Sequence, residues 1–476
     1  MISETVKGLF SAHEIGFTLP IIFITALSCT LLATKAAFAE AIVELTCQLL
    51  RLPSPAKGKR ALPGVPFQWP NGQGTEKFFD GRNSAKKWRS QYGSIFTIWS
   101  GFKREIVMTK PAHIKTFYKD SHVHIKSADN NAGWLFAELL GECVGVVSQK
   151  RWKRVRGHFD GHFTRPASLN RTDLFISDAG NFIESLNGPK EGFIIDPAND
   201  MKYCPFFLVA SIFFGRLTPD QRRKLSTLGP PREVLFREAF QGGINRFKIT
   251  KYFPGSALSR LREFQRGWED FVREAAEQAL EKGDGSIVSL WEAVQKEELT
   301  MRELLQTLDE SLFANLDVTT HAVSWNILRL AQHTEIQDKV FLEMQQHVGE
   351  PGKYEEYLRK EDTLLAACIL EASRLHPVLP FSNPEAAEDN KVIDGYLIPR
   401  KTDVIVDAYA VNVDNTYWQN ALEYDPYRHL GSKDPLTLAR EKATDSVKVQ
   451  EDSWIGLPNG RVQLIPRPVE TLGSRD

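Results

Sequence analysis

Apolar positions recur at helical spacing through the middle of the chain. The longest such stretch runs from Thr300 to His333, contains no Gly or Pro, and has a leucine at every fourth position from Leu304 to Leu316. This spacing predicts one long helix. A second helix is predicted from about Asp362 to Leu375, because apolar residues line one side of it and Pro377 stops it.

Two other regions show the pattern of β-strands. Ser94 to Thr109 consists of two β-like runs divided by Gly101, which predicts a hairpin. Val392 to Val413 is rich in Val, Ile and Tyr and is interrupted by the turn residues Asp394-Gly395 and Pro399-Arg400, so it predicts short strands and turns. Helices dominate early and strands late. The predicted fold class is therefore α+β, mostly helical.

The amino-terminal part of the chain predicts a membrane anchor. Ile15 to Thr34 is an uncharged stretch of the length needed to cross a bilayer, which predicts one transmembrane helix. Basic residues are concentrated after it, so the positive-inside rule places the main domain in the cytosol, at the endoplasmic reticulum membrane. The alternative is a signal peptide cleaved after Ala37-Phe38-Ala39, but the leading segment has no net positive charge.

Composition narrows the domain organisation and the partners. We expect an anchor over residues 1–50, a stiff proline-rich hinge over 51–70 and one globular domain over 71–476. With 59 Lys and Arg against 60 Asp and Glu, there is no basic bias that would indicate a nucleic-acid partner. The five cysteines are scattered and predict neither a disulfide framework nor a structural zinc site.

Three motifs with possible chemistry appear in order along the chain. Trp152 and Arg156 stand four residues apart in a basic helical stretch, and Glu371 and Arg374 stand three apart just before a proline. Arg428 follows in the segment Asp-Pro-Tyr-Arg-His. Each pair alone is typical of an ordinary helix surface.

Taken together, these motifs resemble the cytochrome P450 family of haem-thiolate monooxygenases, over nearly the whole chain. The resemblance implies that Glu371, Arg374 and Arg428 form a buried cluster that supports the haem-binding core. It also implies that Trp152 and Arg156 contact the haem propionates. The alternative for the second pair is an amphipathic surface helix with a half-buried Trp.

Within the long helix, residues 313–320 (FANLDVTT) look like the oxygen-activation segment of this family. The resemblance makes Asp317 the acid that relays protons, because proton delivery needs an ionisable group beside a hydroxyl or water. Asn315 stands where Gly is usual and Val318 where the first Thr is usual. Thr319 lies one residue further round the helix, so a relay through Asn315 and water is the alternative.

The resemblance breaks at the cysteine loop that should hold the haem iron. No cysteine follows Cys368, and neither the loop nor the helix after it is present. Thiolate donation promotes O–O cleavage, so monooxygenation is not expected without it. The flanking sequence indicates a deletion near residues 440–449. No metal ligand is predicted: His429 should face away, and the spacing of His158 and His162 is attributed to chance.

The resemblance implies a monooxygenase that oxidises a small apolar molecule, with electrons from a separate NADPH-cytochrome P450 reductase in the same membrane. Several stretches look like filamentous-fungal enzymes that tailor secondary metabolites, including enzymes acting on cyclic dipeptides. The residues expected to face the substrate are Val378 to Phe381 and those near Phe313. The alternatives are a membrane-tethered pseudoenzyme without the thiolate and a non-haem helical membrane protein.

Overall fold

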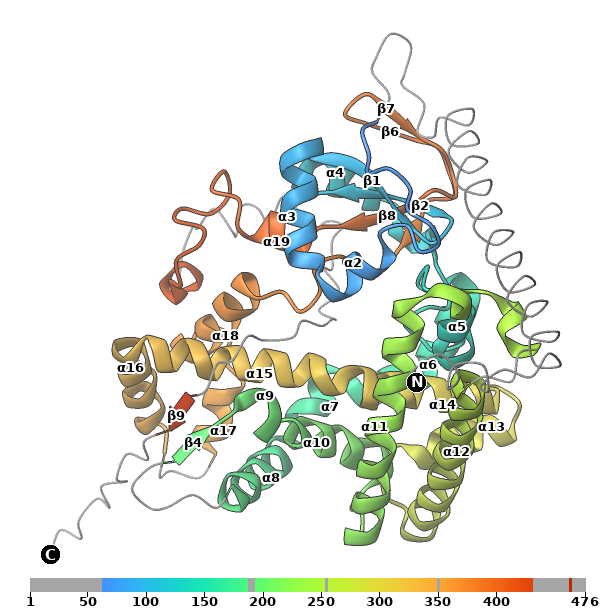
Figure 1. The fold of residues 1–476 in the computed structure, drawn as a ribbon. Coiled ribbons are helices and arrows are strands. Elements are labelled where there is room, and N and C mark those ends of the chain that lie inside the picture. The colour runs from blue at the N-terminus through green and yellow to red at the C-terminus, as the bar shows by residue number, and fades with distance from the viewer. Residues whose placement is uncertain (1–61, 187–192, 253–255, 349–351, 431–461, 465–476) are drawn as a thin grey trace, which may run out of the picture.

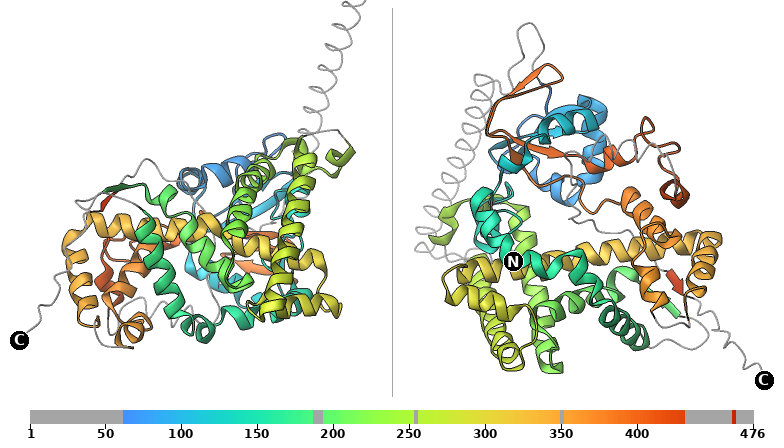
Figure 2. Two further views of the ribbon diagram at one scale, coloured as in Figure 1. Left: turned by 90° about the horizontal axis from the view of Figure 1, so that it is seen from below. Right: turned by 180° about the vertical axis from the view of Figure 1, so that it is seen from behind.

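The computed structural model describes residues 62–186, 193–252, 256–348, 352–430 and 462–464. They form a sheet-containing part, which carries β1, β2 and β8, and a larger helical part crossed by the long helix α15 (Figure 1). Views from below and from behind show helices α11 and α12 beside each other at one end of α15, with α16 at the other end (Figure 2). The predicted α+β, mostly helical class is confirmed.

The helices have the following bounds: α2 Gly74–Phe79, α3 Gly81–Tyr92, α4 Pro111–Tyr118, α5 Trp134–Leu140, α6 Gln149–Phe163, α7 Arg165–Leu169, α8 Thr172–Ser185, α9 Pro197–Asp200, α10 Tyr203–Phe214, α11 Pro219–Gln241, α12 Ser256–Lys282, α13 Ile287–Gln295, α14 Met301–Asp309, α15 Asn315–Gln332, α16 Thr334–Gln345, α17 Lys353–Leu358, α18 Leu364–Leu375 and α19 Ala408–Asn412. Short helical turns are η1 Ser121–Val123, η2 Gly243–Arg246, η3 Lys248–Tyr252, the π-turn η4 Glu310–Ala314 and η5 Pro426–His429. The strands are β1 Ile95–Ser100, β2 Lys103–Met108, β3 Ile125–Lys126, β4 Phe193–Ile195, β5 Glu385–Ala386, β6 Lys391–Ile393, β7 Tyr396–Ile398, β8 Asp403–Val406 and β9 Val462–Leu464.

The predicted hairpin is confirmed as β1 and β2, which pair antiparallel from Ile95↔Met108 to Ser100↔Lys103. β2 then pairs in parallel with β8, so residues about 300 positions apart share one sheet of order β1-β2-β8-β5-β3. Alternate side chains enter two different core clusters, with Ile106 on one face and Val107 on the other. Both faces are therefore covered, which explains the unbroken apolar run in β2.

The predicted long helix exists but is not regular. Thr300 caps its start by accepting from the backbone N–H of Glu303, and the α-helical pattern is interrupted by the π-turn at Glu310–Ala314. The helix resumes as α15 and ends at Gln332. A π-turn inserts an extra residue per turn and is frequent at functional sites, and nothing in the regular leucine spacing indicated it.

The second predicted helix is α18, which starts two residues later than expected because Thr363 acts as its cap. The strand prediction for Val392 to Val413 holds for β6, β7 and β8 but is wrong over Ala408–Asn412, which is the helix α19. The side chain of Asp407 accepts the backbone N–H of Ala410 and so starts a helix there.

Part of the predicted hinge lies among the described residues. Residues 62–66 run alongside β1, with hydrogen bonds between Val65 and Thr97 and between Thr97 and Pro63. The predicted anchor, Ile15 to Thr34, and the predicted deletion near residues 440–449 lie outside the described residues. Among the helices that the structure does describe, none has both the length and the apolar character required to traverse a bilayer.

Candidate functional site

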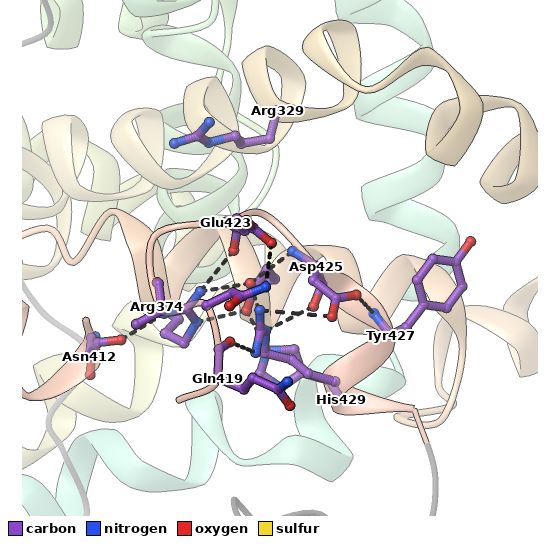
Figure 3. Close-up of polar contacts among 12 residues, drawn as sticks. Arg329, Arg374, Asn412, Gln419, Glu423, Asp425, Tyr427 and His429 are labelled. Atoms are coloured by element: carbon purple, nitrogen blue, oxygen red, sulfur yellow. Dashed lines mark hydrogen bonds and ion pairs between the residues drawn. The ribbon is translucent and has the colours of Figure 1, made fainter. Parts of the chain in front are cut away.

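Glu371 on α18 is the centre of a dense polar cluster. Figure 3 labels three of its partners, Arg374, Asp425 and His429. The Glu371 side chain is fully buried, and the guanidinium of Arg374 binds it with two hydrogen bonds, Nε to Oε2 at 2.8 Å and Nη2 to Oε1 at 2.7 Å. Arg428 from η5 adds a third, Nε to Oε1 at 3.0 Å. The structure therefore brings together the three residues that the sequence predicted as a buried cluster, although Arg428 lies more than 50 positions after the other two.

The two arginines use their remaining donors on backbone carbonyls. Arg374 donates through Nη1 to Asn412 and to Ala421, at 2.7 and 2.6 Å, and Arg428 donates through Nη1 to Gln419 at 2.9 Å. Planar guanidinium groups can serve a carboxylate and several carbonyls at once. The cluster thus ties α18 to the end of α19 and to the loop that leads into η5.

Two members of this cluster were missed by sequence reasoning. The backbone N–H of Asp425 donates to Glu371 Oε1 at 3.0 Å, and His429 Nε2 lies 2.9 Å from Glu371 Oε2. His429 therefore faces the carboxylate, as a satisfied structural group would. Burial would raise the pKa of Glu371, but the hydrogen bonds from Arg374, His429 and Asp425 lower it to about 2.

The segment predicted for proton relay lies at the π-turn and the start of α15. Asn315 donates through Nδ2 to the carbonyl of Ser311, and the hydroxyl of Thr319 donates to the carbonyl of Asn315 at 2.8 Å. Both side chains are thus engaged with their own helix. Among the described residues, neither makes a side-chain hydrogen bond to Asp317.

Asp317 points toward another element. Its Oδ1 lies 3.7 Å from Nζ of Lys202, just before α10, and Lys202 also pairs with Glu233 of α11 at 3.3 Å. Burial is the main effect on the Asp317 carboxyl and raises its pKa, while the charge of Lys202 opposes this and that of Glu233 adds to it. A carboxyl that protonates more readily than usual can hold and release a proton nearer neutral pH.

Trp152 and Arg156 lie together on α6, as their spacing predicts. The guanidinium carbon of Arg156 is 4.9 Å from the centre of the Trp152 ring, and Lys126 from β3 approaches the same ring at 5.7 Å. Arg156 is 44% exposed and donates to both carboxylate oxygens of Asp160. The Trp152 ring is thus flanked by two cations, and Arg156 is half exposed to solvent. The binding of haem propionates by Trp152 and Arg156 stays a prediction.

The residues expected to face a substrate separate into two places. Phe381 is buried in a core cluster against the sheet and stacks on Trp88 with ring centres 6.2 Å apart, and its contact with a substrate stays a prediction. It shares this core cluster with Ala85 and Trp88 of α3. Phe313 lies at the π-turn and lines a pocket together with Asp317.

The described residues do not fit a haem-thiolate ligand. The three described cysteines are Cys143, Cys204 and Cys368, and burial raises the pKa of each thiol. A raised pKa disfavours the thiolate form that binds iron. Cys143 and Cys368 are also packed inside apolar clusters. None of the three described cysteines therefore offers a ready thiolate to haem iron.

Comparison with known proteins identifies the relatives of this chain. The family model "Cytochrome P450" matches residues 63–448. The cytochrome P450 monooxygenase verC of Clonostachys rogersoniana is 54% identical, covering 87% of this chain and 90% of that protein. The cytochrome P450 monooxygenase gliC of Aspergillus fumigatus is 42% identical, covering 86% and 90%.

A solved structure of a zebrafish cytochrome P450 with progesterone shares the fold, with a TM-score of 0.59, 18% identity, and coverage of 76% of this chain and 89% of that one. The alignment with verC has 453 positions, but only 87% of the 476 residues of this chain take part in it. The other positions are gaps in this chain, so verC has residues inside the aligned region that this chain lacks. The haem cofactor expected from the resemblance is that of the family. The chain belongs to the cytochrome P450 family and is an oxidoreductase of its monooxygenase class.

Proposed function

We propose that this protein oxidises a small apolar molecule as a tailoring step in fungal secondary-metabolite biosynthesis, with a cyclic-dipeptide-derived compound as the candidate substrate. The observation that carries the proposal is the 54% identity to the monooxygenase verC over 90% of that protein. The second fungal relative, gliC, is similar over the same share of its length. The buried Glu371 cluster and the irregular segment at Asp317 are the structural features that support it.

The residues of this chain supply positioning and proton transfer. Haem, when bound to a member of this family, supplies the oxidising chemistry. Asp317 holds a proton at its carboxyl group and exchanges it with Lys202 or water, because burial favours the protonated form and the Lys202 ammonium favours the charged form. Glu371, Arg374 and Arg428 serve as structural support.

In this proposal the native gene encodes the cysteine loop, and this chain lacks the segment that contains it. In this proposal the loss lies near residues 440–449, where both flanks still resemble the family. The additional residues of verC inside its alignment with this chain support the same view. The competing proposal is a catalytically inactive, membrane-tethered remnant of a cytochrome P450. The absence of any cysteine after Cys368 favours it.

We further propose that the protein is anchored in the endoplasmic reticulum membrane and receives electrons from NADPH-cytochrome P450 reductase. The uncharged stretch from Ile15 to Thr34 supports the anchor. Exposed apolar side chains support contact with the membrane surface. They are Phe102 (43%), whose ring contacts Phe247, and Ile249 (54%) and Tyr252 (74%) in η3, which directly follows Phe247. Recovery of the protein in the alkaline-washed membrane pellet is expected, and recovery in the soluble fraction would contradict the anchor.

The first experiment pairs sequencing of the native transcript across residues 440–449 with a carbon-monoxide difference spectrum of reduced membranes. A transcript that encodes the loop, together with a thiolate-type Soret band from its product, is the expected result. A transcript identical to this chain, with no haem signal, would overturn the monooxygenase proposal in favour of the inactive remnant.

A further inference from the structure

Glu303 on α14 forms a second buried acid cluster with two arginines of α6. In Figure 1, α6 and α14 lie toward the opposite end of α15 from α18, which carries Glu371. Glu303 is fully buried, and Arg151 donates through Nε to its Oε1 at 2.8 Å. Arg154 donates through Nη2 to Oε1 at 2.6 Å and through Nη1 to Oε2 at 3.1 Å. One carboxylate therefore binds two arginines of the same helix.

The Glu303 carboxylate is also fixed to its own helix. Its Oε2 accepts the backbone N–H of Thr300 at 3.0 Å, while the Thr300 hydroxyl accepts the backbone N–H of Glu303, so the two residues form a capping box. Burial would raise the pKa of Glu303, but hydrogen bonds from Arg154, the Thr300 backbone and Arg151 lower it to about 2. The carboxylate is therefore charged near neutral pH and is held at the first turn of α14.

The face of the long helix that carries Glu303 also binds the chain that leads into α6. The backbone N–H of Glu142 donates to Oε1 of Gln306 at 2.6 Å, and that of Gly145 donates to Oε2 of Glu310 at 2.9 Å. A Cβ on Gly145 would overlap the Glu310 carboxylate, so glycine permits this close approach. These bonds fix where α6 begins, but they leave its rotation about its own axis to other contacts.

The rotation of α6 decides which way Trp152 and Arg156 face. At 100° per residue, Arg151 and Arg154 lie on one side of the buried Val155. Trp152 and Arg156 lie on the other side of it. A rotation that pulled the two arginines away from their carboxylate would therefore also move the Trp152–Arg156 pair.

Lys126 of β3 lies on the side that this pair faces. Its ammonium nitrogen is 5.7 Å from the centre of the Trp152 ring, and the guanidinium carbon of Arg156 is 4.9 Å from the same centre. Cations are attracted to an aromatic ring, and two of them together create a positive potential around it. The potential at Trp152 therefore depends on α6 keeping the ring next to Lys126.

We propose that Glu303 is a positioning residue, which acts through the two arginines to fix the rotation of α6. In that rotation the Trp152–Arg156 pair stays beside Lys126. The inference rests on the proposed function, because this pair is the one predicted to contact the carboxylates of haem in that reaction. Glu303 binds the other side of α6, so its effect on the pair passes through the helix.

The test is quenching of tryptophan fluorescence by iodide and by caesium in the detergent-solubilised full-length protein at constant ionic strength. Subtracting the signal of the matching Trp152→Phe protein isolates the emission of Trp152. Each quenching constant is divided by that of free N-acetyltryptophanamide, and the iodide-to-caesium ratio is the readout. Because Lys126 and Arg156 concentrate anions and repel cations, the ratio should be about 3 or more in the parent protein. A ratio of about 1 there would contradict the proposal.

Glu303→Gln should lower this ratio at least about twofold, because a neutral amide cannot hold both guanidinium groups. The change in charge alone acts in the opposite direction, since removing a negative charge near Trp152 would draw in more iodide. A circular dichroism spectrum like that of the parent protein confirms that the variant is folded. An unchanged or higher ratio in the folded variant would refute the positioning role.

A second pair of variants keeps the proposal testable if Glu303→Gln does not fold. Arg154→Gln removes two hydrogen bonds to the Glu303 carboxylate, and Lys153→Gln is its matched control, because Lys153 is exposed on the same helix. Both variants remove one positive charge, and Lys153 is nearer to Trp152 around the helix, at about 100° against about 160° for Arg154. If position governs the ratio, Arg154→Gln lowers it at least about twofold and Lys153→Gln changes it less. If charge alone governs it, Lys153→Gln has the larger effect, and that result would overturn the proposal.

The two proposals fail in different ways, because the fluorescence test needs no haem. If membranes show the thiolate-type band but the ratio is unchanged in Glu303→Gln and Arg154→Gln, the positioning role is refuted and the monooxygenase proposal stands. If the ratio falls as expected but the complete native product gives no haem signal, the positioning of α6 stands and the monooxygenase proposal fails.

Discussion

Replacing Glu371 with glutamine tests the buried cluster most directly. Glutamine has nearly the same shape, but it carries no charge and replaces one acceptor oxygen with a donor NH₂ group. In the folded protein that NH₂ group would face donors from Arg374, Arg428 or Asp425, depending on its orientation. The variant therefore leaves two buried cations without a counter-charge.

The expected loss can be estimated in two ways. Removing one partner of a buried ion pair costs about 3 to 5 kcal/mol. Independently, a pKa of about 2 for Glu371, against an ordinary value of 4.5, corresponds to about 3 kcal/mol of folding free energy at neutral pH. For a domain of this size, such a loss should lower the melting temperature by about 4 to 7 °C.

The assay is thermal unfolding of the detergent-solubilised full-length protein near neutral pH, followed by circular dichroism. The control is Glu269→Gln, which removes an exposed i,i+4 pair with Arg273 at 2.6 Å and should cost less than about 0.5 kcal/mol. Equal melting temperatures for the two variants would refute the stabilising role of the Glu371 cluster. Normal cellular abundance of Glu371→Ala would count against it too.

Three further predictions concern other residues. Hydrogen bonds from Arg154, Arg151 and the Thr300 backbone lower the pKa of Glu303 to about 2, so its contribution to stability is complete above about pH 4.5 and is lost as the pH falls toward 2. Glu303→Gln should therefore lower the melting temperature at neutral pH and make it depend less on acid pH, and an unchanged acid profile would contradict this. Burial raises the pKa of Asp407 to about 6, so its ionisation costs folding free energy as the pH rises above 3.8. Asp407→Asn can still cap Ala410, so chemical denaturation should show the variant more stable by up to about 3 kcal/mol at pH 7.5 and by little at pH 4. Destabilisation at both pH values would refute this. Thr319→Val removes only hydrogen bonds to the carbonyls of Asn315 and Leu316 in the same helix, so the melting temperature should change by less than about 2 °C. A larger fall would reveal a wider role for the hydroxyl.

The elements that sequence reasoning located correctly are those governed by local signals. The hairpin at Ser94 to Thr109 follows from two β-rich runs and one glycine, and the start of the long helix follows from the cap at Thr300. The i,i+3 spacing of Glu371 and Arg374 placed both on one face of α18, and the structure shows them paired. In each case the information lies within a few residues.

The features that sequence reasoning missed depend on contacts between distant segments. The parallel pairing of β2 with β8 and the approach of Lys202 to Asp317 leave no periodic trace in the chain. The sequence pattern predicts strand where the helix α19 lies, because its apolar residues resemble those of the strands before it. Only the capping geometry of Asp407 distinguishes it, and Asp407 alone was too weak a signal.

The Glu371 cluster also bears on the missing cysteine loop. All the described partners of Glu371 lie between Arg374 and His429, ahead of the predicted deletion near residues 440–449. The ion pairs that hold α18 to η5 therefore form without the loop. It follows that a haem-free product can retain this part of its fold, so stability and abundance cannot distinguish an inactive remnant from an enzyme whose sequence lacks a segment. The native transcript and the iron-ligand spectrum can make that distinction, because they report on the thiolate itself.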